Sequence, residues 1–251
     1  MAGLLVSPST PVVVTGGGSG IGRESARALA EAGRPVAAWD LNAGGAAETA
    51  AICADLGVAT FSAAVDVRDL DAIRAAVTGT LDALGGVGGL VHAAGVPMGF
   101  TADDLSTEEF RLVLSVNLEA EAVLVRELLP ALRDANPGSA IVGISSIEGL
   151  IGHGNVPAYT ASKHALIGLT RSLAARLGPE GIRINACAPA TSPRRCSCRS
   201  SRATRRPGRA SSARSPSGAW ATRRRSGASC ASCCPTTRAT STAERSWPTG
   251  A

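Results

Sequence analysis

The chain has 251 residues, of which 45% are hydrophobic and 18% are charged, so it is long enough to bury a sizeable core. It contains no run of about 20 consecutive apolar residues, which argues against a membrane span. The N-terminal segment lacks the basic region and cleavage site of a signal peptide, and we expect a cytoplasmic protein.

The net charge of +5 conceals two parts of opposite character. Residues 1–189 contain 12 basic and 19 acidic residues, whereas residues 190–251 contain 13 arginines, no lysine and one acid, Glu244. The second part also has no Val, Ile, Leu, Met, Phe or Tyr, so it cannot form a core. We therefore expect one folded domain over residues 1–189 and an Arg/Ser-rich tail over residues 190–251.

Residues 1–189 alternate short β-branched runs with longer segments of helical period, as β-α-β units do. This pattern predicts an α/β fold with a doubly wound parallel sheet, the Rossmann fold. The expected strands are Val12–Thr15, Pro35–Asp40, Val58–Asp66, Val87–Ala93, Ala140–Ser145 and Ile182–Ala188. The expected amphipathic helices are Ile21–Ala32, Ala46–Leu56, Asp69–Leu84, Thr107–Arg133 and Ala158–Leu177.

A glycine-rich turn, TGGGSGIG at 15–22, joins the first strand to the first helix. Such a turn leaves backbone N–H groups and a helix N-terminus free to bind the pyrophosphate of a dinucleotide, although taken alone it could be an ordinary turn. Gly16 can form the tight turn, Gly20 lets the backbone approach the phosphates, and Gly22 allows close helix–strand packing. The cofactor-binding residues expected here are Gly16, Gly18, Ser19, Gly20, Ile21 and Gly22.

Acidic residues end the next two strands. Asp40 lies 18 residues after Gly22, where a carboxylate can bind the adenosine ribose and would repel a 2′-phosphate. No Lys or Arg lies inside the turn or directly after Asp40, so we expect NAD rather than NADP. Asp66 and Val67 can contact adenine, although Asp66 could instead cap the helix expected from Asp69.

Tyr159 and Lys163 lie four residues apart and therefore share one helix face, and Ser146 lies 13 residues before Tyr159 at a strand end. An ammonium about 4 Å from the phenol supplies about 4 kcal/mol at an effective dielectric of about 20. This energy matches the roughly three units by which the pKa of a tyrosine must fall for proton transfer at neutral pH. Taken alone, Tyr159 and Lys163 could be solvated surface residues of a helix, and Ser146 could be a turn former.

In this order and spacing, residues 10–189 resemble the short-chain dehydrogenase/reductase family in its single-domain form. The matching segments are TGGGSGIG, Asp40, Asp66-Val67, HAAG at 92–95, Asn117 in SVNLEA, ISS at 144–146, YTASK at 159–163 and RINACAP at 183–189. The resemblance implies an NAD-dependent oxidoreductase that interconverts a secondary alcohol and a ketone, as a homodimer or homotetramer. It also implies that Ala93, Ala94 and Gly95 approach the cofactor, although His92 stands where the family usually has Asn.

The resemblance assigns catalytic roles to four residues. Tyr159 exchanges a proton with the substrate oxygen, and Lys163 stabilises its phenolate and holds the nicotinamide ribose. Ser146 donates a hydrogen bond to the developing alkoxide. Asn117 resembles the family's helix-kinking Asn, which anchors a water of the proton relay.

The remaining chemically active residues are expected to be passive. His153 and His164 have no placed partner and are expected at the surface, Cys53 and Cys187 are expected to be inert core thiols, and no metal site is expected. Two other functions stay open. One is an NADPH-dependent 3-oxoacyl-thioester reductase, against which Asp40 argues, and the other is a nucleic-acid binder that uses the basic tail.

Residues 190–251 allow three interpretations: a nucleic-acid-binding arm, a zinc site, or translation in the wrong reading frame. The C-x-C and C-x-x-C-C spacings without His match no common zinc site. Loss of one base after Pro189 would restore PGDVATPML, and the same shift gives ALGRLGDPEEIG from 215–227 and GGAELADGG from 242–251. These segments resemble the end of the family's sequence. We favour the frame error and expect the chain as written to be poorly soluble and inactive.

Overall fold

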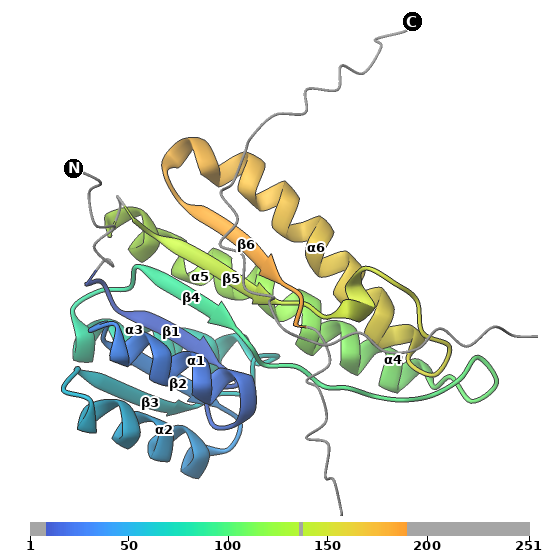
Figure 1. Ribbon diagram of the computed structural model, residues 1–251, viewed down its shortest axis with the longest axis horizontal. Coiled ribbons are helices and arrows are strands. Elements are labelled where there is room, and N and C mark those ends of the chain that lie inside the picture. The colour runs from blue at the N-terminus through green and yellow to red at the C-terminus, as the bar shows by residue number, and fades with distance from the viewer. Residues whose placement is uncertain (1–8, 136–137, 190–251) are drawn as a thin grey trace, which may run out of the picture. The chain divides into compact units, whose positions relative to one another are not determined.

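The computed structural model describes residues 9–135 and 138–189, which contain a parallel sheet flanked by helices (Figure 1). The strands in this part of the chain are β1 Val12–Thr15, β2 Val36–Asp40, β3 Thr60–Ala64, β4 Gly89–His92, β5 Ala140–Ile144 and β6 Arg183–Cys187. Their order in the sheet is β3-β2-β1-β4-β5-β6, and every neighbouring pair is parallel. This order is the doubly wound Rossmann arrangement, so the expected fold class is confirmed.

Helices connect successive strands. They are α1 Gly20–Glu31, α2 Ala43–Asp55, α3 Leu70–Leu84, α4 Thr107–Leu114, α5 Ala120–Asp134 and α6 Pro157–Leu177. Short turns η2 Ile147–Gly149 and η3 Gly178–Glu180 precede and follow α6. The longest expected strands are shorter in the structure, because residues such as Asp66, Ala93 and Ser145 lie outside the hydrogen-bonded strands. These residues therefore lie just past the carboxyl ends of the strands.

The chain is helical from Thr107 to Asp134, as the prediction of a helix over Thr107–Arg133 requires. The helix is not uniformly α-helical, because a π-helical turn, η1 Ser115–Glu119, lies between α4 and α5. Inside it the amide of Asn117 hydrogen-bonds to Val96 and Ser162, which lie on other segments. Such turns often occur at functional sites, because the extra residue turns a side chain toward a new partner.

The core has one layer on each face of the sheet, because successive side chains of a strand point to opposite faces. Val13 of β1 belongs to the larger buried cluster, which includes Leu124 of α5, whereas Val12 and Val14 belong to a second cluster with Ala26 of α1. Both faces of the central strand are therefore covered, which explains its uninterrupted run of valines.

The expectation of two core thiols is half right. Cys53 of α2 is buried, and this burial raises the pKa of its thiol, as an inert cysteine requires. Cys187 of β6 is exposed, so its assignment to the core is wrong. It alternates with Ile184, which packs into the larger cluster, and so Cys187 lies on the other face together with the exposed Asn185.

Candidate functional site

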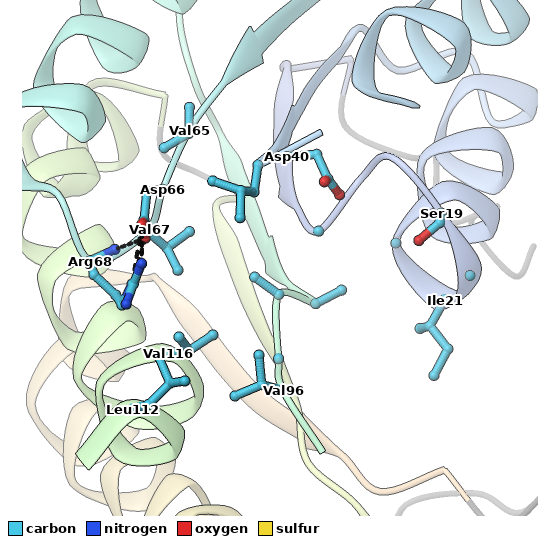
Figure 2. Close-up of a pocket in the computed structure, with 17 residues that line it drawn as sticks. Ser19, Ile21, Asp40, Val65, Asp66, Val67, Arg68, Val96, Leu112 and Val116 are labelled. Atoms are coloured by element: carbon cyan, nitrogen blue, oxygen red, sulfur yellow. Dashed lines mark hydrogen bonds and ion pairs between the residues drawn. The ribbon is translucent and has the colours of Figure 1, made fainter. Parts of the chain in front are cut away.

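A cavity of about 610 Å³ lies beyond the carboxyl ends of β1 to β4, where the strand order reverses (Figure 2). Parallel α/β sheets bind ligands at such a switch point. The cavity is lined by every residue of the glycine-rich turn that the sequence assigned to the cofactor except Gly18, and by the assigned residues Asp40, Asp66, Val67, Ala93, Ala94 and Gly95.

The glycine-rich turn has a backbone that side chains would obstruct. Gly16 and Gly20 have φ angles of 64° and 51°, which disfavour other residues. A Cβ atom at Gly16 would lie 2.7 Å from the backbone nitrogen of Ala94, and one at Gly22 would overlap the carbonyl of Gly16. Ser19, the N-cap of α1, makes no capping hydrogen bond, so the first N–H groups of this helix are free to bind an anion.

Asp40 holds the turn in place. Its carboxylate accepts hydrogen bonds of 2.8 Å from the backbone nitrogens of Gly18 and Asn42. A Cβ atom at Gly18 would lie 2.8 Å from Cγ of Asp40, so only glycine permits this approach. Arg23, which the sequence analysis missed, donates to the carbonyl of Gly18 at 2.6 Å and pairs with Glu48 at 2.6 Å. Gly18 thus supports the site through hydrogen bonds to Asp40 and Arg23, although it does not line the cavity.

Asp66 lies on the opposite side of the cavity, where Figure 2 shows it bonded to Arg68. Nε and Nη2 of Arg68 donate to the carboxylate at 2.9 Å and 2.5 Å. This hydrogen-bonded side chain lowers the pKa of Asp66. The alternative role of Asp66 as a helix cap is wrong, because Asp69 accepts the bonds from the first turn of α3. Arg68 lines the cavity and is a residue that the sequence analysis missed.

A smaller cavity of about 300 Å³ contains three of the four residues assigned to catalysis, Ser146, Tyr159 and Lys163. Ile21, Ala93 and Gly95 line both cavities, so the two are adjacent. The structure therefore brings the expected catalytic residues to one end of the expected dinucleotide site.

The ammonium of Lys163 is buried and firmly held. Nζ donates a hydrogen bond of 2.7 Å to the carbonyl of Ile144 and lies 5.5 Å from the centre of the Tyr159 ring. Burial lowers the pKa of Lys163 to about 8, and the charge of Glu121 opposes this shift. Ser145, another residue missed from the sequence, donates to the backbone carbonyl of Lys163 at 3.2 Å and ties α6 to the end of β5.

Asn117 lies behind this cavity and is completely buried. Its Oδ1 accepts from the backbone nitrogen of Val96 at 2.8 Å, and its Nδ2 donates to the carbonyl of Val96 and to Oγ of Ser162 at 3.3 Å and 3.1 Å. Asn117 thereby links the segment after β4 to α6, the helix that carries Tyr159. In the structure Asn117 is therefore a hydrogen-bonded link between these elements.

His92 departs from the resemblance but is well satisfied. It is buried between Oγ1 of Thr15, 2.9 Å from Nδ1, and the carbonyl of Val116, 3.2 Å from Nε2. Because a carbonyl only accepts, Nε2 carries the proton and Nδ1 accepts from the Thr15 hydroxyl. Burial, with a smaller contribution from Lys163, lowers the pKa of His92 to about 4. His92 is therefore neutral and holds the π-helical turn.

The other expectations concern absences and surface residues. His153 and His164 are exposed, as expected. Within residues 9–135 and 138–189, no group of three or more His, Cys, Asp or Glu side chains is arranged to hold a metal ion. Among the same residues, no helix has the length and apolar character needed to cross a bilayer.

Comparison with known proteins decides the family. Residues 10–193 match the family model for short chain dehydrogenase. The chain belongs to the short-chain dehydrogenase family. It is 35% identical over 182 residues to a 2,5-dichloro-2,5-cyclohexadiene-1,4-diol dehydrogenase of Sphingobium indicum, covering 71% of this chain and 70% of that protein. It is 37% identical to an NAD(+)-dependent 2-dehydro-3-deoxy-L-rhamnonate dehydrogenase of a Sphingomonas species, covering 71% of this chain and 70% of that one.

Solved short-chain dehydrogenases share the fold. Carveol dehydrogenase from Mycobacterium avium in complex with NAD superposes with a TM-score of 0.70 at 30% identity, covering 73% of this chain and 71% of that one. An NAD-bound xylitol dehydrogenase gives a TM-score of 0.70 at 29% identity, covering 74% and 72%. These comparisons confirm the expected family. They also confirm the expected activity, that of an NAD-dependent oxidoreductase acting on an alcohol carbon.

Proposed function

We propose that this chain is an NAD(H)-dependent oxidoreductase that interconverts a secondary alcohol and a ketone. The observation that carries this proposal is the ammonium of Lys163, fixed between the carbonyl of Ile144 and the ring of Tyr159. This pair lines a cavity that is adjacent to the glycine-rich one and shares three lining residues with it. Proton transfer and dinucleotide binding would then occur side by side.

The larger cavity fits a dinucleotide. The uncapped N-terminus of α1 and the crowded glycines suit a pyrophosphate, because both present backbone N–H groups without side chains. Asp40 uses one lone pair of each carboxylate oxygen on the backbone, so further lone pairs can accept the ribose hydroxyls. When bound, the nicotinamide supplies the site that exchanges hydride with the substrate carbon.

The residues of the smaller cavity would handle the substrate oxygen. The hydroxyl of Ser146 accepts from the backbone nitrogen of Glu148 at 3.2 Å, which leaves its proton available for the substrate. Tyr159 would exchange the proton, and the nearby charge of Lys163 would stabilise its phenolate form. Asn117 would keep the π-helical turn against α6 so that these side chains stay aligned.

Further parts of the proposal rest on the sequence alone. They are the cytoplasmic location, assembly into a homodimer or homotetramer, and a boundary near residue 189 between the catalytic domain and the tail. Residues 190–251, on which the tail interpretations fall, lie outside the described residues.

The test combines turnover with DNA binding. We would follow the absorbance of the reduced dinucleotide with NAD or NADP and a panel of secondary alcohols, for the full chain and for a chain with the frame restored after Pro189. The expected result is NAD-linked oxidation by the restored chain that requires Tyr159. A salt-sensitive DNA complex without turnover in either chain would overturn the proposal.

A further inference from the structure

A carboxylate lies buried behind the candidate catalytic lysine. Glu121 of α5 has an exposed fraction of 0%, and neither of its carboxylate oxygens has a hydrogen-bond partner among the described residues. An isolated buried charge is costly, and most proteins pair such a group or avoid it. The ionised carboxylate of Glu121 therefore needs a positive charge nearby to offset the cost of its burial.

The position of Glu121 brings it to the strand that holds Lys163. Its Oε1 lies 2.8 Å from the point that a Cβ atom at Gly143 would occupy, and Oε2 lies closer still. Only glycine at this position of β5 leaves room for the carboxylate. The next residue, Ile144, accepts the hydrogen bond from Nζ of Lys163 at 2.7 Å. The carboxylate and the ammonium thus approach adjacent residues of β5, one from α5 and the other from α6.

The two groups act on each other electrostatically. Burial lowers the pKa of Lys163 to about 8, and the carboxylate of Glu121 counteracts this shift. Burial raises the pKa of Glu121 to about 7, and the ammonium of Lys163 counteracts that shift in turn. Each group therefore favours the charged form of the other.

The other ionisable groups near this pair do not replace Glu121. His92 of β4 is held neutral, because burial lowers its pKa to about 4. Tyr159 of α6, whose ring centre lies 5.5 Å from the ammonium, is the partner that this charge would stabilise. On α3, which packs against α5, Arg74 pairs with Glu127 at 3.0 Å. Among the described residues, Glu121 is the carboxylate whose charge acts on Lys163.

We propose that Glu121 is a positioning residue, whose buried carboxylate supplies the negative charge that keeps Lys163 an ammonium beside Tyr159. Without this charge, the desolvated lysine would favour the neutral amine, and the phenolate of Tyr159 would lose its cation. The catalytic meaning of the pair rests on the proposed function, whereas the pairing of charges can be measured without any turnover.

The composition of the chain makes this measurement direct. Lys163 is the only lysine among the 251 residues, and Tyr159 is the only tyrosine. In whichever form of the chain is soluble, as written or with the frame restored after Pro189, lysine labelled isotopically at Cε gives an NMR signal for Lys163, which is identified by its loss in Lys163→Arg. The absorbance of the phenolate reports Tyr159 in the same sample.

Two substitutions separate charge from shape. Glu121→Gln keeps the shape but removes the charge, and we expect the pKa of Lys163 to fall by about one unit or more. Glu121→Asp keeps the charge, and we expect the pKa of Lys163 to stay closer to its native value. Glu127→Gln, a matched change on the same helix at a residue that pairs with Arg74, should leave Lys163 unchanged. A Lys163 titration that is the same in Glu121→Gln and the native chain would overturn the proposal.

The native chain provides a second test, which holds even if Glu121→Gln does not fold. The signal of Lys163 should show an additional inflection near pH 7, where Glu121 ionises. The exposed His164 is the next residue in sequence, so a His164→Gln variant must retain that inflection. A single-step titration, or an inflection lost with His164, would also overturn the proposal. Failure to find turnover would instead count against the proposed function.

Discussion

Replacing Asp40 with alanine should remove the preference for NAD over NADP. In the structure this carboxylate ends β2, lines the larger cavity and accepts hydrogen bonds from the backbone nitrogens of Gly18 and Asn42. A 2′-phosphate on the adenosine ribose would approach the same carboxylate. The two backbone dipoles offset only part of its charge, so the phosphate would be repelled.

The size of this effect follows from the exposure of the site. Asp40 is partly exposed, so the effective dielectric lies between about 20 and 80, and two unit charges about 4 Å apart repel by about 1–4 kcal/mol. A phosphate monoester carries a charge of about −1.5 to −2, which raises the lower limit to about 1.5 kcal/mol. Since about 1.4 kcal/mol corresponds to tenfold in affinity, we expect NADH to bind at least tenfold tighter than NADPH.

Equilibrium binding measures this preference without knowledge of the substrate. In the chain with the frame restored after Pro189, the dissociation constants of NADH and NADPH, from fluorescence titration, should become similar in Asp40→Ala. Both should rise, because Gly18 and Asn42 lose their acceptor. Asp55→Ala removes an exposed carboxylate from the end of α2 and serves as the control with the same change in net charge. Tighter binding of NADPH by the native chain, or an unchanged ratio in Asp40→Ala, would refute the reasoning.

Three further predictions concern the neighbouring residues. In the chain with the frame restored after Pro189, Tyr159→Phe should lower turnover by about a thousandfold yet leave the dissociation constant of NADH nearly unchanged, and near-normal turnover would exclude its role in proton transfer. Ser162→Ala removes the acceptor of the Asn117 amide and should lower the free energy of unfolding by about 1 kcal/mol in urea titrations; no change would contradict the assigned link. Because the pKa of His92 is about 4 in the folded chain, the unfolded chain binds more protons between pH 4 and 6.5. As the pH is lowered from 6.5 to 4, the contribution of His92 to the free energy of unfolding should therefore fall by about 3 kcal/mol. The difference in free energy of unfolding between the native chain and His92→Asn should change with pH by this amount.

The sheet was predictable because its signals are local. Buried parallel strands appear as short β-branched runs. Both ends of every expected strand lie within two residues of the ends of the observed strand. The π-helical turn between α4 and α5 was not predictable from helical periodicity, and only the resemblance to a helix-kinking Asn at position 117 indicated it. It depends on partners of Asn117 that lie 21 and 45 residues away in the sequence, Val96 and Ser162. Helical periodicity does not register such contacts.

The positions of site residues were predictable from the sequence where these residues follow the end of a strand. Parallel strands bring their carboxyl ends to one edge, so Asp40 and Ser146 needed only the correct strand assignment. Arg23, Arg68 and Glu121 were missed because a charged residue in a helix or loop usually belongs to the solvated surface. Their partners come from other segments, and a sequence pattern does not identify those.

The change of composition at residue 190 leads to the last prediction, a shift of reading frame after Pro189. The family match ends at residue 193, close to this point, and the Sphingobium relative is covered over only 70% of its length. After a one-base loss, the middle base of each restored codon is the first base of a present codon. Serine codons of the TCN type, cysteine and tryptophan supply the T that restores apolar residues, so three family-like segments in the correct order are hard to obtain by chance. We expect the chain with the restored frame to be soluble and to oxidise a secondary alcohol with NAD, and the chain as written to do neither. The mass and peptides of the native protein decide the matter: peptides from residues 190–251 as written, in a fully active protein, would exclude the frame shift.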